Sequence, residues 1–127
     1  MKKTNNQIGA TGESVAAAYL RQEGYLIHTV NYRGRYGEID LVAEKDGVLA
    51  FVEVKTRCSL AFGRPSDYVT PAKIAKLTAT AKEYLFYNDT DLQPRFDVVE
   101  VLTAQKGCFD QVKIHHIPSA FDVDDMD

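Results

Sequence analysis

The sequence predicts one α/β or α+β domain, in which helices flank a mixed β-sheet in the order αβββαββ. Apolar residues recur at helical spacing in two segments, and five other segments are rich in β-branched and aromatic residues. The chain has 127 residues and contains no repeat or low-complexity linker, which fits one domain. We place this domain at residues 1–121 and expect residues 122–127 to form a disordered acidic tail.

The first helix is expected over residues 7–23. Its apolar residues Ile8, Val15 and Leu20 fall on one stripe with their neighbours, and a glycine at position 24 is a natural stop. Gly9 and Gly12 are poor helix formers. Their presence predicts close backbone packing near the start of this helix.

The second helix is expected to begin after Thr70, which is a good N-cap, with Pro71 in the first helical position. It should end near residues 87–88. We expect its aromatic residues Tyr84, Phe86 and Tyr87 to pack in the core and at the helix end, not to act as platforms for nucleic-acid bases.

Strands are expected over residues 26–33, 37–44, 48–57, 95–102 and 111–117. Asp46-Gly47 between the second and third is a strong tight-turn signal. With a two-residue or four-residue loop, Asp40 stands directly opposite Glu53, and Glu38 stands opposite Lys55. A three-residue loop would shift this register by one residue.

Two carboxylates in directly opposite positions have Cβ atoms about 4.5–5.5 Å apart and repel each other. Lys55 could offset the repulsion between Asp40 and Glu53 as a simple salt-bridged face. A divalent cation could also offset it, because Mg²⁺ is often held by one or two carboxylates plus water and phosphate. In that second case Lys55 could orient or deprotonate an attacking water, or stabilise charge on a phosphoryl group.

The formal net charge is −3, but four of the last six residues are acids, and without them 15 basic residues face 14 acidic ones. A local basic face on a nearly neutral body is typical of a phosphate-binding surface, although a solvated surface would have the same composition. The candidates for phosphate contact are Arg33, Arg35, Arg57, Arg64, Lys73 and Lys76.

No apolar run is long enough to span a bilayer, and no apolar stretch follows the lysines at the N-terminus. Cys58 and Cys108 are expected to be reduced thiols. These features predict a cytoplasmic protein that does not associate with membranes. Arg95 and Asp97 are expected to form an ion pair at a strand end, and Glu38 to pair with Lys55 or a nearby arginine.

Asp40 and Glu53-Val54-Lys55, in this element order, resemble the signature of the PD-(D/E)XK nuclease superfamily. More closely, residues 7–102 resemble the YraN-like family of uncharacterised bacterial proteins, often described as candidate endonucleases. The stretches that carry the resemblance are Gly12-Glu13, Asn31-Tyr32-Arg33, residues 37–41, residues 51–57, Phe62-Gly63 with Pro65, Lys73, and residues 95–99.

The resemblance implies a restriction-endonuclease-like core, similar to that of Holliday junction resolvases. It implies that Asp40, Glu53 and the main-chain carbonyl of Val54 hold Mg²⁺ or Mn²⁺, that Lys55 serves the attacking water, and that Glu13 joins the site. The implied reaction is hydrolysis of a DNA phosphodiester, on branched or junction DNA in repair or recombination, and a resolvase would act as a homodimer.

Two alternatives stay open on the sequence. One is a non-catalytic nucleic-acid-binding or scaffold protein that retains the nuclease fold, and the other is a structural metal site. Glu13 could also be an ordinary solvated helix residue.

Overall fold

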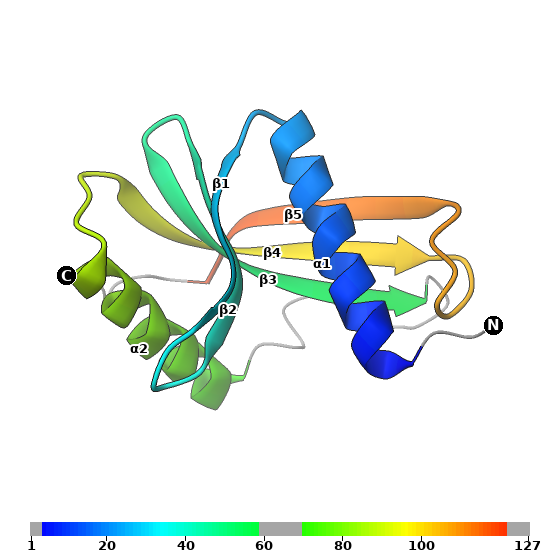
Figure 1. Cartoon of the computed structure of the whole chain (residues 1–127), viewed down its shortest axis with the longest axis horizontal. Coiled ribbons are helices and arrows are strands. Elements are labelled where there is room, and N and C mark those ends of the chain that lie inside the picture. Colours follow the sequence, from blue (N-terminus) through cyan, green and yellow to red (C-terminus); the bar gives the residue numbers. More distant parts are fainter. Residues whose placement is uncertain (1–3, 59–69, 122–127) are drawn as a thin grey trace.

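The structure, a computed structural model, describes residues 4–58 and 70–121 (Figure 1). The seven elements follow the predicted order αβββαββ, and their ends lie within a few residues of the predicted ones. They are α1 (Asn5–Gln22), β1 (Leu26–Arg33), β2 (Glu38–Lys45), β3 (Val48–Cys58), α2 (Pro71–Tyr87), β4 (Gln93–Thr103) and β5 (Val112–Phe121).

Both helices begin at threonine N-caps. Thr70 accepts a hydrogen bond from the Lys73 N–H, and Pro71 follows it as predicted. Thr4 forms a capping box with Gln7, in which each side chain accepts a hydrogen bond from the other residue's backbone N–H. The first helix therefore starts two residues earlier than its apolar stripe suggests.

The five strands form one sheet in the order β1-β2-β3-β4-β5. Neighbouring strands are antiparallel except β3 and β4, which are parallel because α2 carries the chain back across the sheet between them. The helices cover opposite faces of this mixed sheet (Figure 1). The fold is thus α+β and matches a restriction-endonuclease-like core, as expected.

Each helix buries its own apolar cluster. Ala16 and Leu20 of α1 pack with Val52 of β3, whereas Leu77 and Tyr84 of α2 pack around Phe51 and Phe96. Each fully buried large apolar side chain contributes about 1.5–3 kcal/mol to stability, so the packing on both faces stabilises the sheet.

The aromatic residues of α2 behave differently from one another. Tyr84 is in the core, with 6% of its surface exposed, but Phe86 and Tyr87 are 80% and 71% exposed. The expectation that all three pack was wrong for these two, because the last turn of α2 directs them away from the sheet and mainly toward each other, with ring centroids 5.0 Å apart.

The Arg95–Asp97 ion pair is confirmed, with Asp97 buried and Arg95 partly buried. Arg95 Nε lies 2.8 Å from an Asp97 oxygen, and His116 Nε2 lies 2.8 Å from the other. Burial alone would raise the pKa of Asp97, but hydrogen bonds from His116 and Arg95 hold it below its usual value. This network ties β4 to β5.

Arg64, the Phe62-Gly63 stretch and the acidic tail lie outside the described residues. Neither described helix has the combination of length and apolar character needed to cross a membrane.

Candidate active site

The β2–β3 hairpin has the predicted register, but only over part of its length. Pairing runs from Lys45 with Val48 to Leu41 with Val52, and then stops. Beyond that point β2 pairs only with β1, while β3 continues beside β4. The prediction that Asp40 lies directly opposite Glu53, and Glu38 opposite Lys55, was therefore wrong.

The strands part because the β1–β2 ribbon twists strongly. Leu41 packs into the cluster under α1, whereas Ile39, two residues earlier, packs into the cluster under α2. Strict alternation would place both on one face, so the strand turns over at Asp40. Two-stranded ribbons twist more than wide sheets, and Figure 1 shows this ribbon curving away from β3.

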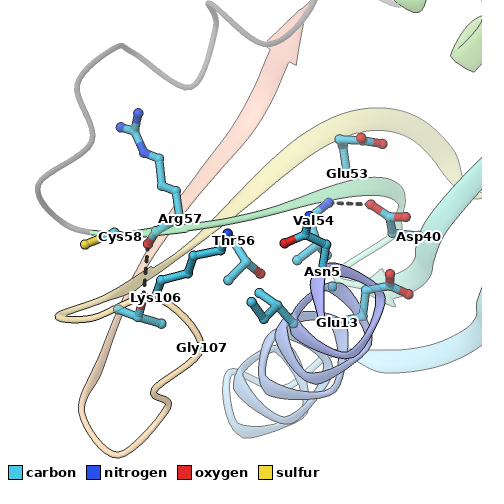
Figure 2. Close-up of a pocket in the computed structure, with 13 residues that line it drawn as sticks. Asn5, Glu13, Asp40, Glu53, Val54, Thr56, Arg57, Cys58, Lys106 and Gly107 are labelled. Carbon is cyan, nitrogen blue, oxygen red and sulfur yellow. Dashed lines mark hydrogen bonds between the residues drawn. The ribbon is translucent and has the colours of Figure 1, made fainter. Parts of the chain in front are cut away.

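Asp40 fills the opening between the strands. Its Oδ2 accepts a 2.7 Å hydrogen bond from the Val54 N–H, which β2 leaves unpaired (Figure 2). In an extended strand the N–H and C=O of one residue point to the same side. The carbonyl of Val54 therefore also faces the opening, on the side where Asp40 lies.

The carboxyl of Asp40 is ionised with difficulty. Burial, and then the charge of Glu53, raise its pKa from 3.8 to about 7, although the Val54 N–H acts in the opposite direction. Around neutral pH this group is therefore poised between its acid and its carboxylate.

Glu13 reaches the opening from α1. Figure 2 shows its carboxylate on one side of Asp40, with Glu53 on the other. Burial raises the pKa of Glu13 and the charges of Glu38 and Glu53 add to this effect, although a hydrogen bond with Asn31 acts in the opposite direction. Among the described residues, no hydrogen-bond partner reaches its buried Oε1. A solvated helix residue would not have these properties.

Gly12 explains how Glu13 comes so close. A Cβ at Gly12 would overlap the hydroxyl of Thr56 on β3, so glycine is required where α1 crosses this strand. The predicted close packing is thus confirmed for Gly12. It was wrong for Gly9, where an added Cβ would meet nothing within 4 Å.

Glu53 belongs to the opposite face of the sheet, where two lysines hold it. Its Oε1 lies 2.7 Å from Lys73 Nζ of α2 and 3.4 Å from Lys55 Nζ. Burial, and then the contact with Lys73, lower the pKa of Lys55. For Lys73, burial alone would lower the pKa, but the hydrogen bond with Glu53 raises it. The surroundings therefore favour the charged form of Lys73 and disfavour that of Lys55.

The acidic side chains line two hollows that meet at the opening. A groove of about 470 Å³ on the α1 side is lined by Glu13, Asp40, Glu53 and Val54, and a smaller one of about 240 Å³ on the α2 side is lined by Asp40, Glu53, Lys73 and Lys76. Asp40 and Glu53 are common to both. Sequence reasoning missed Asn5, Thr56 and Lys106, which also line the larger groove and which no spacing connects to the acids.

The arginines proposed to contact phosphate differ in how closely they lie to the acids. Arg57 lines the larger groove, but its Nε lies 2.8 Å from Glu100, whose side chain is 3% exposed. Arg33 is solvated and pairs with Glu38 at 3.4 Å, which confirms an arginine partner for that acid. Arg35 lies apart from the acids, near exposed aromatic rings.

The donor set suits a hard cation such as Mg²⁺. Asp40, Glu53 and the Val54 carbonyl offer only oxygen, and the buried, partnerless Glu13 oxygen is a fourth donor nearby. Within residues 4–58 and 70–121, no three Asp, Glu, His or Cys side chains are grouped as a ready metal centre. The residues therefore fit a cation that keeps several waters, not a fully protein-ligated one.

Fold and site together define an α+β domain of the restriction-endonuclease-like class, with an acidic opening in its sheet. The model of the uncharacterised protein family UPF0102 matches residues 12–101, which span Glu13 and the whole Asp40–Lys55 region. The chain belongs to this family, the YraN-like group.

Similar proteins of this family occur in several bacteria. The chain is 41% identical to a UPF0102 protein of Flavobacterium psychrophilum, with 92% of this chain and 95% of that protein covered. It is 46% identical to a UPF0102 protein of Syntrophomonas wolfei, with 92% and 99% covered. A third, from Chlorobium phaeobacteroides, is 47% identical over 80% of this chain and 81% of its own.

Proposed function

We propose that this protein is a metal-dependent endonuclease that hydrolyses DNA phosphodiester bonds, with Mg²⁺ or Mn²⁺ as its cofactor. One observation carries the proposal. Three carboxylates from α1, β2 and β3 line one opening in the sheet, and a lysine with a lowered pKa lies beside them. A surface that only binds phosphate has no need of clustered carboxylates.

In this proposal Asp40, Glu53 and the Val54 carbonyl would hold the cation, and Glu13 would accept hydrogen bonds from water beside it. The cation, when bound, polarises the phosphoryl group and makes the attacking water more acidic. Lys55 would orient that water and accept its proton while the water oxygen bonds to phosphorus and one P–O ester bond breaks, and the leaving oxygen would take a proton from solvent. Burial lowers the pKa of Lys55, which favours the uncharged amine that this role needs. Lys73 fixes the Glu53 carboxylate through its 2.7 Å contact.

DNA would approach along the two hollows. Lys73 and Lys76 lie in the first turns of α2, where the helix N-terminus also favours phosphate. Lys106 and Arg57 lie along the larger groove. Contacts of this kind make binding weaken as salt increases. Such a substrate implies a cytoplasmic protein, and paired cuts at a four-way junction would need a homodimer.

A second candidate function is a nucleic-acid-binding protein without turnover. The observation that favours it is the engagement of Glu53 by Lys73, together with the lack of a ready three-ligand group among the described residues. In that case the lysines alone would neutralise the acids.

The test is cleavage of labelled duplex, flap and four-way-junction DNA with Mg²⁺, Mn²⁺ or a chelator. Variants Asp40→Ala and Lys55→Ala should lose cleavage but keep DNA binding, because neither change removes the basic surface. Asp46→Asn is the matched control, since this acid is exposed in the β2–β3 turn and lines neither hollow. Intact binding without cleavage in any metal would instead support the non-catalytic function.

A further inference from the structure

A cluster of exposed aromatic rings lies apart from the acids. Tyr36 is 53% exposed, Phe86 80% and Tyr87 71%, and all three line an open groove of about 540 Å³. We refer to these three rings, with the flanking cations Arg35 and Lys82, as the aromatic platform. Exposed apolar surface gathered in one groove marks a binding site more often than scattered exposure does.

The platform is built from two elements that are fastened together. Phe86, Tyr87 and Lys82 come from the last turns of α2, whereas Arg35 and Tyr36 come from the turn between β1 and β2. The carboxylate of Glu83 accepts hydrogen bonds from the Arg35 N–H at 3.0 and 3.3 Å. Glu83 thereby docks the turn onto the helix, and part of its own charge is used in doing so.

The charges in the groove favour an anionic partner with flat, apolar groups. The Arg35 guanidinium lies 5.8 Å from the centre of the Tyr36 ring, and Lys82 lines the same groove. Aromatic rings beside cations are the surface that single-stranded nucleic acid requires, because bases stack on the rings while phosphates contact the cations.

The platform also continues the proposed active site. Lys73, Lys76 and Glu83 follow one another along α2 at spacings of three and seven residues, so they share one side of the helix, and Phe86 lies three residues beyond Glu83. From Lys73 to Phe86 the helix rises about 20 Å. Gly37 and Lys76 line the smaller hollow beside Asp40, next to the turn that carries Tyr36. A strand leaving the acids could thus follow α2 to the rings.

We propose that the aromatic platform binds a single-stranded segment of the substrate, so that the enzyme prefers DNA with an unpaired branch or end. The preference of the enzyme for such DNA rests on the proposed nuclease function. The binding of a single strand to the platform does not depend on it. Bases stack on Phe86 and Tyr87, and Arg35 and Lys82 contact the phosphates on either side.

The experiment measures fluorescence anisotropy with a chelator present, so that no cleavage occurs. The probes are a blunt duplex and the same duplex with a ten-nucleotide thymidine overhang, each labelled on the duplex. Wild-type protein should bind the overhang probe more tightly. Phe86→Leu with Tyr87→Leu should weaken that binding about tenfold or more, because two stacks are lost and each is worth about fivefold or more. Blunt-duplex binding should stay within twofold.

Three controls separate stacking from other effects. Phe86→Tyr keeps a ring and should bind as the wild type does. Leu26→Ala removes an apolar side chain that is 62% exposed at the other end of β1, and should change neither affinity. Melting temperatures of all variants should agree, because the replaced rings are exposed.

The outcomes are distinguishable from those of the nuclease test. Equal affinity for the two probes, or equal loss on both in the leucine variant, would refute the platform even if the protein cleaves DNA. Overhang-specific loss in a protein that never cleaves would support the platform and refute the proposed catalysis. If sedimentation shows a dimer that the leucine variant abolishes, with overhang binding unchanged, the rings are a contact between copies and the proposal fails.

Discussion

Replacing Asp40 with asparagine should stabilise the metal-free protein at pH 8. Burial, and then the charge of Glu53, raise the pKa of Asp40 from 3.8 to about 7. At pH 8 the carboxyl is ionised in both the folded and the unfolded chain, and the folded chain carries the cost of that charge. Asparagine removes the charge and retains an oxygen that can accept the Val54 N–H.

The size of the effect follows from the shift in pKa. A shift of about three units corresponds to at most about 4 kcal/mol, at 1.36 kcal/mol per unit. Partial exposure of Asp40 and screening by salt reduce this value, and we expect about 2 kcal/mol. In a domain of this size, that free energy raises the melting temperature by about 6–10 °C.

The difference must also depend on pH with a defined sign. The raised pKa means that the folded wild type binds more protons than the unfolded chain between pH 4 and 7, so its stability falls as pH rises through that window. The gap between Asp40→Asn and wild type should therefore open from pH 4 to 7 and stay constant above it. Thermal melts in a chelator from pH 4 to 9 measure this gap.

A matched control is Glu38→Gln, which neutralises a neighbouring acid whose side chain is 57% exposed. It should leave the melting temperature within about 1 °C. Equal melting temperatures for Asp40→Asn and wild type at pH 8, or a gap that does not vary with pH, would refute the electrostatic reasoning about this site.

Two further changes test how the framework holds the site. Gly12→Ala should destabilise the fold by about 1–3 kcal/mol in urea unfolding, because its Cβ overlaps the Thr56 hydroxyl. Adding Thr56→Ala should restore most of the lost stability, because the nearest remaining atom is then the Cβ of residue 56, at 3.1 Å from the new methyl group. If stability does not recover, the overlap with the hydroxyl is not the cause. Arg57→Met should cost about 3 kcal/mol by leaving Glu100 buried without its cation, and Glu100→Gln in the same chain should recover much of it. An additive pair would contradict that coupling.

The sequence predicted the elements well because local signals determine them. Helix α2 begins at Thr70-Pro71 and the hairpin turns at Asp46-Gly47, as the capping and turn preferences of these residues predict. The turn also set the hairpin register correctly as far as Leu41. Residues such as Glu13 came from a resemblance, and the structure puts Glu13 in the same groove as Asp40.

Sequence reasoning could not predict where the hairpin stops pairing. That point depends on how far the β1–β2 ribbon twists when α1 and α2 compete for its apolar residues, which is a tertiary effect. The contact of Lys73 with Glu53 was missed for a similar reason, since residues on a strand and a later helix meet only through the sheet. The exposed rings of α2 were missed because apolar character alone does not tell a core residue from a binding residue.

The separation of β2 from β3 joins the hollow on the α1 side of the sheet to the hollow on the α2 side, so that both belong to one site. If the ladder had continued, the N–H and C=O of Val54 would pair with β2, and a closed sheet would keep Glu13 from Glu53. Because the strands part at Asp40, this acid can accept the Val54 N–H and line both hollows, with Glu13 of α1 on one side and the lysines of α2 on the other. Burial of the Asp40 charge, and then its repulsion from Glu53, destabilise the metal-free chain, so a cation that relieves both would couple binding to stability. The twist of a two-stranded ribbon thus supplies both the geometry and the electrostatic strain on which the proposed chemistry depends.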